Sequence, residues 1–233
     1  MDKLQEFLLT APVILFSMVA HEYAHGYAAL KQGDPTAYQL GRLTWNPLKH
    51  IDPFLTVIIP LVTYWYSHGS FIFGGAKPVP VNPRNYRRFK RGDIIVSLAG
   101  IATNLVLAVV CTLLVILTGL IGRSAPAASE SIALLQVMLI KGILFNLILA
   151  MFNLLPIPPL DGSHVMKYFL PPAWSLRYQE VGRYGLFILM ILLWSGLGGG
   201  LLATWMAPVG ALYRMAMGAA YPYLLSSPFT AGL

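Results

Sequence analysis

The sequence predicts an all-α polytopic membrane protein with about five to six membrane helices. Of its 233 residues, 57% are hydrophobic and only 11% are charged, and the mean hydropathy is +0.66. A soluble domain carries about 25% charged residues. The net charge is +7. The lysines and arginines lie between the apolar runs and form no basic stripe interleaved with aromatic residues. We therefore expect the lipid bilayer as a partner, expect no nucleic acid, and attribute the cations to membrane topology.

Five apolar segments are long enough to be considered as membrane helices. They are residues 11–30, 94–121, 132–155, 181–197 and 201–225. We expect one integral-membrane domain over residues 1–233. Its core would occupy residues 11–165, and the C-terminal helices would lie within residues 181–225.

A sixth apolar segment, residues 54–66, is some thirteen residues long and contains Pro60. A spanning helix needs roughly 17–25 residues, so we predict a re-entrant or half-buried helix here. In residues 74–83, which follow, prolines exclude a helix and the alternation of residues favours short extended strands. We predict a small membrane-associated β-hairpin at this place, after the second apolar segment.

The residues that carry chemistry begin inside the first apolar segment, where His21, Glu22 and His25 form an H-E-x-x-H pattern. The spacing places both imidazoles on one face of a helix, one turn apart, where they can share a Zn²⁺ ion. An ionisable group near the bilayer centre costs about 2.5–3.5 kcal/mol on insertion scales, so the pattern indicates a function. Zinc lowers the pKa of a bound water toward roughly 7, and Glu22 is the candidate general base.

A catalytic zinc site needs a third protein ligand, and Asp161 is the candidate. If residues 54–66 do not cross the membrane, residues 94–121 run outward and residues 132–155 return, which brings Asp161 to the side of His25. The loop lysines and arginines mark this side as cytoplasmic, because most of them lie there. The expected cofactor is one Zn²⁺ per chain, and the same ligand set could accept Co²⁺ or Mn²⁺.

Other polar residues have simpler explanations. Ser97, Gly100 and Asn104 form a small polar helix face that allows another helix to approach closely. Asn104 and Asn146 are expected to hydrogen-bond between helices at about 0.6 kcal/mol each. The other three histidines are expected at interfaces rather than as ligands, and they are His50, His68 and His164.

The pattern at His21 and His25, together with residues 153–162 (NLLPIPPLDG), resembles the site-2 protease family of intramembrane zinc metalloproteases. The resemblance covers most of residues 11–162. It extends through residues 46–53, 76–83 and 99–104. The chain is similar to the minimal form of the family, without the PDZ or CBS domains that many relatives carry. One departure is Ile101, where many relatives have proline.

The resemblance implies hydrolysis of peptide bonds within or near transmembrane segments of substrate proteins. The enzyme would be a multi-pass protein of a bacterial or archaeal cell membrane, with its active site toward the cytoplasm. His21, His25 and Asp161 would be the metal ligands. Glu22 would be the general base, and Asn153 would help to stabilise the oxyanion. An unwound substrate would add a strand to the extended segment, whose residues are Lys77, Pro78, Val79, Pro80, Val81 and Asn82.

Two other function classes stay open on the residues alone: a divalent-cation transporter and a catalytically silent membrane adaptor that keeps its metal for structure. A transporter needs ligands that face one another across several spans, and the remaining spans carry few ionisable side chains. Glu22 argues against the adaptor, because a closed structural metal site has no use for a base. The oligomeric state and the natural substrate are not specified by the sequence.

Overall fold

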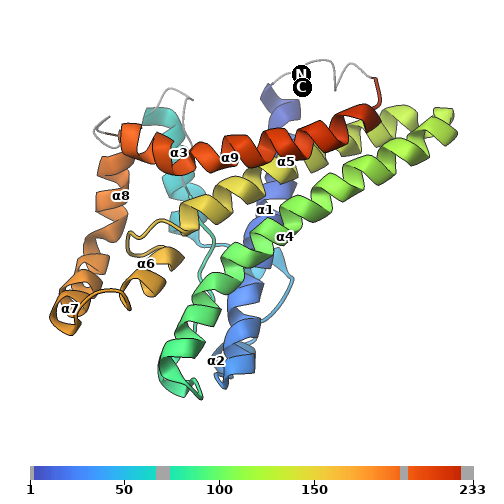
Figure 1. Ribbon diagram of the computed structural model, residues 1–233. Helices are drawn as coiled ribbons and strands as arrows, with labels where there is room; N and C mark the ends of the chain where they lie inside the picture. The colour runs from blue at the N-terminus through green and yellow to red at the C-terminus, as the bar shows by residue number, and fades with distance from the viewer. Residues whose placement is uncertain (1–2, 67–73, 195–198, 227–233) are drawn as a thin grey trace. The chain divides into compact units, whose positions relative to one another are not determined.

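A computed structural model of the chain describes residues 3–66, 74–194 and 199–226. In these ranges the protein is helical (Figure 1). The α-helices are α1 Lys3–Gln32, α2 Thr36–Gln39, α3 Ile59–Tyr66, α4 Phe89–Ser124, α5 Ser129–Asn153, α6 Asp161–Met166, α7 Pro172–Val181, α8 Gly185–Trp194 and α9 Gly199–Ala220. The short helices are η1 Pro47–His50, η2 Pro53–Ile58, η3 Pro83–Asn85, η4 Pro126–Ala128, η5 Gly182–Tyr184 and η6 Tyr221–Tyr223.

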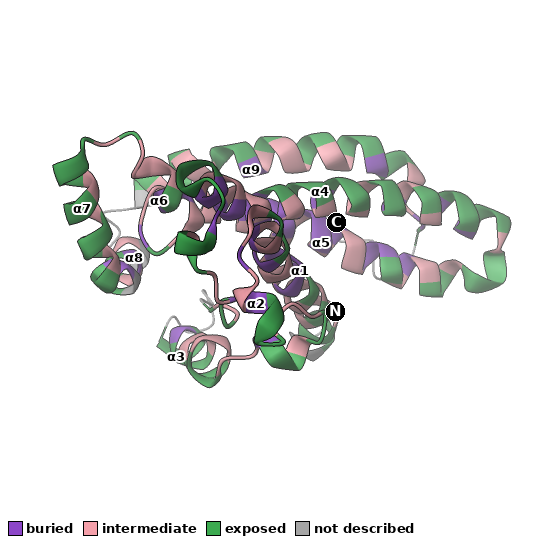
Figure 2. Ribbon diagram, turned by 90° about the horizontal axis from the view of Figure 1, so that it is seen from below, coloured by how far each residue is buried: buried purple, intermediate pink, exposed green. Residues whose placement is uncertain are grey.

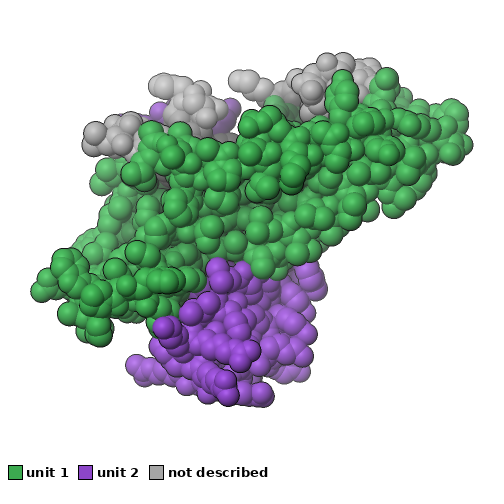
Figure 3. All heavy atoms as spheres, in the orientation of Figure 1, with its two compact units in different colours: residues 1–17, 101–233 green, residues 18–100 purple. Residues whose placement is uncertain are grey.

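The chain divides into two compact units, which Figure 3 shows in different colours. One unit consists of residues 1–17 and 101–233, and the other of residues 18–100. Because helices α1 and α4 are long, each contributes residues to both units. The two units are described separately below.

The core of the unit formed by residues 1–17 and 101–233 is built from α4, α5 and α9. Helices α5 and α9 run side by side (Figure 1). Their buried side chains form one apolar cluster, to which α4 also contributes. The fully or nearly buried members are Ala108, Val115, Ile140, Ile143, Leu147, Val209 and Ala220. Burying an apolar side chain that would otherwise contact water stabilises a fold by about 1.5–3 kcal/mol. Between helices in lipid, close van der Waals packing provides the stabilisation instead.

Helix α4 has a long exposed face, green in Figure 2, and the side chains on it are apolar. Its exposed side chains include Val106, Val109, Leu113 and Leu117, each 51% exposed or more. A soluble helix would place polar residues on this face, so the pattern indicates contact with lipid.

Among the described residues, three helices are long and apolar enough to cross a membrane: residues 5–32, 89–124 and 126–153. This number corrects the expected five to six membrane helices, although the polytopic helical class holds. Helix α8 has only ten residues, and α9 carries Pro208 and an arginine within its 22 residues. Residues 195–198, which fall within the predicted C-terminal spans, lie outside the described ranges.

The short apolar segment near residue 60 is helical over Pro53–Tyr66 and is shorter than a membrane span, as the sequence predicts. Asp52 caps its start, because its Oδ1 accepts hydrogen bonds from the N–H groups of Phe54 and Leu55 at 2.9 Å. The helix begins with π-type turns before α3.

The predicted β-hairpin is wrong. Within the described residues, the segment 74–82 is irregular and pairs with no strand. The N–H groups of Gly75, Lys77 and Val79, at alternate positions, donate to the carbonyls of Leu55 and His50 and to the Glu22 side chain. Pro78 and Pro80 have no N–H to offer a neighbouring strand. The segment therefore cannot form the ladder that a hairpin requires.

Candidate metal centre

Helix α1 presents His21 and His25 on one face, within the unit of residues 18–100. Their Nε2 atoms lie 3.0 Å apart, and the ring centroids are 4.6 Å apart at an interplanar angle of 78°. A tetrahedral zinc ion bound at about 2.0–2.1 Å would hold two such nitrogens roughly 3.3 Å apart. The two imidazoles therefore converge at a spacing that fits a shared ion.

The other nitrogen of His25 is fixed by the backbone of α4. Its Nδ1 lies 2.7 Å from the carbonyl oxygen of Val96, and a carbonyl can only accept. The proton of the neutral ring is therefore on Nδ1, which leaves the lone pair of Nε2 for a metal. Sequence reasoning missed this contact because any residue type at position 96 supplies a carbonyl.

Gly100 keeps open the space in front of both histidines. A Cβ atom at this position would lie 2.6 Å from Nε2 of His21 and 2.6 Å from Nε2 of His25. Only a residue without a side chain leaves room at the point toward which both nitrogens are directed. The donor set and this opening together fit a divalent cation. The sequence singled out Gly100 for helix packing and not for the metal site.

Glu22 is held by the extended segment. Its Oε2 accepts a hydrogen bond of 2.7 Å from the N–H of Val79. The carboxylate is half-buried next to the first histidine. A backbone donor to one oxygen fixes the orientation of the carboxylate.

Asp161, the predicted third ligand, is the first residue of α6 and belongs to the other unit. The preceding turn holds its position: Ser163 Oγ donates to the carbonyl of Leu160 at 2.6 Å. A Cβ at Gly162 would lie 2.1 Å from the carbonyl oxygen of Leu154, so only glycine allows this close approach. Glycine at position 162 is thus required by the local backbone, whatever the role of the carboxylate before it.

Asn153 is the last residue of α5, in the same unit as Asp161. Its Nδ2 donates to the carbonyl of Leu149, one turn earlier, at 2.9 Å. An amide group carries two N–H hydrogens, so this bond uses one of them.

Asn104 and Asn146, which are expected to hydrogen-bond between helices, bond to each other. In the unit of residues 1–17 and 101–233, Nδ2 of Asn104 donates to Oδ1 of Asn146 at 2.8 Å. His50 is 1% exposed, and its Nε2 donates to the carbonyl of Thr44 at 2.9 Å, so it is a buried structural residue and not an interfacial one. His68 lies outside the described residues.

The similarity of the chain to known proteins covers the residues described above. Positions 9–194 match peptidase family M50. The chain belongs to this family, the site-2 protease family. No solved structure matches the chain.

Three curated relatives are each provisionally named a zinc metalloprotease. YwhC of Bacillus subtilis is 38% identical over 195 residues, which are 84% of this chain and 83% of the relative. Rip2 of Mycolicibacterium smegmatis is 34% identical over 188 residues, 80% of this chain and 67% of the relative. Rip3 of Mycobacterium tuberculosis is 28% identical over 211 residues, 86% of this chain and 42% of the relative.

The family and the membrane-length helices together define the class of enzyme. The protein is an intramembrane zinc metalloprotease and a metalloendopeptidase. This resolves the choice that the residues alone left open between a protease, a transporter and a silent adaptor.

Proposed function

We propose that this enzyme cleaves transmembrane or membrane-associated protein substrates with one zinc ion held by His21, His25 and Asp161. The observation that carries the proposal is the convergence of two Nε2 atoms, 3.0 Å apart, on a space that Gly100 leaves open. Two imidazoles and one carboxylate leave a fourth position for water or substrate, as a catalytic zinc site requires. When bound, zinc would supply Lewis-acid chemistry that activates water and polarises the scissile carbonyl.

Glu22 is the general base in this proposal. Its carboxylate takes a proton from the attacking water and later returns it to the leaving amine. The Val79 N–H supports this role because it holds one carboxylate oxygen at 2.7 Å. The carbonyl of Val96 acts in the same way on His25, whose ring it keeps in the tautomer that can bind a metal.

Asn153 is proposed to stabilise the negative charge that develops on the scissile carbonyl oxygen. The second N–H of its amide is the donor for this purpose, since the first is bonded to Leu149. Loss of an oxyanion donor typically costs about 2.7–4 kcal/mol in transition-state stabilisation. Asn153→Ala should therefore lower turnover while leaving the zinc content unchanged.

The segment Lys77 to Asn82 is proposed to contact the backbone of the substrate. Its N–H groups at 77 and 79 already donate within the protein, and 78 and 80 are prolines. The carbonyls of Lys77 and Pro78 accept from Arg42, and that of Asn82 accepts from the N–H of Asn85. The acceptors that this segment offers to a substrate are therefore the carbonyls of residues 79–81. A substrate would bind by donating its own N–H groups, which requires that its helix be unwound.

The active site is proposed to face the cytoplasm. In the described part of residues 18–100, every exposed charged side chain is cationic. The exposed cations are Lys31, Lys49, Lys77, Arg84, Arg87, Arg88, Lys90 and Arg91. Cytoplasmic loops carry such an excess of lysine and arginine. Single cysteines in a Cys111→Ala background test the proposal: Asn85→Cys should react from the cytoplasm and Ser129→Cys from outside.

The decisive experiment compares the wild-type enzyme with Glu22→Gln in detergent. Zinc would be measured by elemental analysis, and cleavage would be followed on a model transmembrane helix. We expect one zinc per chain in both proteins and cleavage by the wild type alone. Cleavage by Glu22→Gln at the wild-type rate would exclude Glu22 as the base. Zinc retained in a His21→Ala, His25→Ala double variant would exclude these ligands.

A further inference from the structure

Asp34 is the most completely buried carboxylate of the unit formed by residues 18–100, and no role has been assigned to it above. It is 0% exposed and follows the end of α1, the helix that also carries His21 and Glu22. A buried carboxylate without partners is costly, so its hydrogen bonds indicate what it does.

The position of Asp34 is set by the way α1 ends. Gly33 has a φ of +110°, which is open to glycine but strained for other residues. The N–H of Gly33 donates to the carbonyl of Leu30 at 3.1 Å, and the N–H of Asp34 donates to that of Ala29 at 2.9 Å. This turn points the chain away from the helix axis and fixes Asp34 to its last turn.

Four donors converge on the Asp34 carboxylate. The N–H of Asn82 donates to Oδ2 at 2.6 Å, and Nδ2 of Asn85 donates to Oδ1 at 2.8 Å. The N–H and the hydroxyl of Thr36 also donate to Oδ1. Burial alone would raise the pKa of Asp34, but these hydrogen bonds outweigh it and hold the pKa below its ordinary value.

The bond between Asp34 and Asn82 is linked to the active site by the backbone, because Val79 lies three residues before Asn82 in extended chain. Asn82 ends the segment that contains Val79, whose N–H holds Glu22. Pro80 lies between them and restricts the backbone, so the segment transmits position well. Helix α1 and the turn that follows it therefore hold this segment at two points, Glu22 at residue 79 and Asp34 at residue 82.

We propose that Asp34 is a positioning residue of the protease: by anchoring Asn82 it sets the place of Val79, and through it the orientation of the Glu22 carboxylate. The inference rests on the proposed role of Glu22 as the base. Asp34 itself does not touch the substrate or the reacting water.

The test uses the full chain in detergent and compares Asp34→Ala with Asp34→Glu. Hydrogen exchange of peptides that cover residues 77–82 reports the anchoring directly. Cleavage of the model transmembrane helix gives kcat and KM, and elemental analysis gives zinc. We expect faster exchange in Asp34→Ala, a kcat lower by about 10- to 100-fold, and unchanged zinc. Asp34→Glu should recover part of the kcat.

Thr36→Ala is the matched control. It removes one donor from the same carboxylate without changing the bond to Asn82. Its kcat should remain within about twofold of the wild type, as for a surface substitution.

A second variant separates positioning from a general loss of structure. Val79→Pro removes the N–H that holds Glu22 and should lower kcat with zinc retained. If Asp34 acts through Val79, the double variant Asp34→Ala, Val79→Pro should be about as active as Val79→Pro alone. Multiplicative losses in the double variant would overturn the proposal, as would faster exchange with a normal kcat.

Failure of the proposed function would look different. If Glu22→Gln cleaves as the wild type does, the base is another group, whereas the exchange of residues 77–82 would still report the anchor. Normal exchange in a folded Asp34→Ala protein would overturn the anchor while leaving Glu22 unaffected.

Discussion

The two units each contain a pair of polar side chains on apolar helices, and the pairs differ in what their polar atoms face. In one unit, Asn104 and Asn146 bond to each other, and Asn146 also donates to Ser17 Oγ at 2.9 Å and to the carbonyl of Gly142 at 2.8 Å. In the other, the histidine pair directs two ring nitrogens at one point, next to a glycine.

This difference separates a structural cluster from a candidate site. Every donor of the asparagine cluster meets an acceptor, so the cluster holds helices together and needs no further ligand. Two imidazole nitrogens directed at one open space suit a cation better than they suit each other. Polar residues within apolar helices should therefore be judged by their partners and not by their type.

Of the substitutions that test this difference between the two clusters, Gly100→Ala is expected to have the largest effect. The new Cβ would occupy the space between the two Nε2 atoms, so zinc affinity should fall by about 100-fold or more and cleavage with it. Elemental analysis and the cleavage assay measure both effects. Gly218→Ala is the control, because nothing lies within 4 Å of a Cβ at that helical position. Full zinc binding by Gly100→Ala would show that the ion lies elsewhere.

Lowering the pH should reduce the folding stability of the unit of residues 18–100, because Asp34 becomes protonated. A carboxylate whose pKa is lowered in the folded state contributes stability at pH values above its unfolded pKa of about 3.9. That contribution is lost as the pH falls through the lowered, folded value. Denaturant unfolding followed by tryptophan fluorescence, between about pH 6 and pH 3, should show a larger acid-dependent loss of stability for the wild type than for Asp34→Ala. Parallel pH curves for the two proteins would contradict this expectation.

Asn146→Ala should break the structural cluster without touching the metal centre. The Nδ2 donor of Asn104 and the Oγ acceptor of Ser17 would each lose a partner, and each lost bond between membrane helices costs about 0.6–1.7 kcal/mol. Unfolding in mixed micelles measures the loss, and zinc content should stay the same. Replacing both asparagines by leucine should cost less than the single change, because no unpaired group remains. Loss of zinc in Asn146→Ala would mean that the two clusters are coupled.

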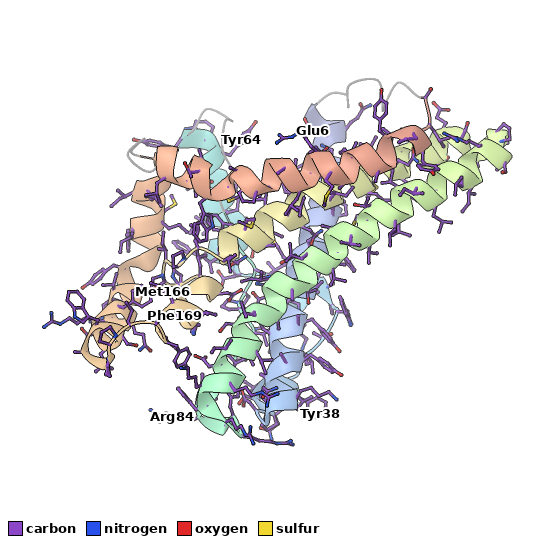
Figure 4. The ribbon with its side chains drawn as sticks, viewed as in Figure 1. Glu6, Tyr38, Tyr64, Arg84, Met166 and Phe169 are labelled. Atoms are coloured by element: carbon purple, nitrogen blue, oxygen red, sulfur yellow. The ribbon has the colours of Figure 1, made fainter. Side chains whose placement is uncertain are left out.

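The smallest effect is expected from Glu6→Gln. Glu6, labelled in Figure 4, forms an ion pair of 3.0 Å with Lys141, and its side chain is 61% exposed. Exposed ion pairs contribute about 0–1 kcal/mol, so the unfolding free energy should change by less than about 1 kcal/mol. Lys141→Gln provides the reciprocal change. If Glu6→Gln lowered the unfolding free energy by more than about 2 kcal/mol, the pair would be shielded from water, as inside a membrane.

Several features of the fold and the site were predictable because they depend on sequence spacing. The i, i+4 spacing of His21 and His25 places them together on any helix, and the apolar length of α4 and α5 predicts spans. That Asn104 and Asn146 each bond to another helix follows from the cost of an unpaired amide in lipid, whereas their choice of each other does not. The predicted hairpin does not form because alternation alone does not make a strand ladder, and Pro78 and Pro80 lack the N–H donors that one requires.

The sequence by itself determined the chemistry of this protein: two imidazoles and a carboxylate on an apolar helix, and the family motif that ends at Gly162. Only the tertiary structure decided which backbone groups serve them. Val96 and Val79 act through a carbonyl and an N–H that every residue possesses. Gly100 and Asp34 owe their effects to their positions, in front of the two histidines and beside Asn82 respectively. Side-chain identity is written in the sequence, whereas the direction of a backbone group is fixed only when distant segments pack together.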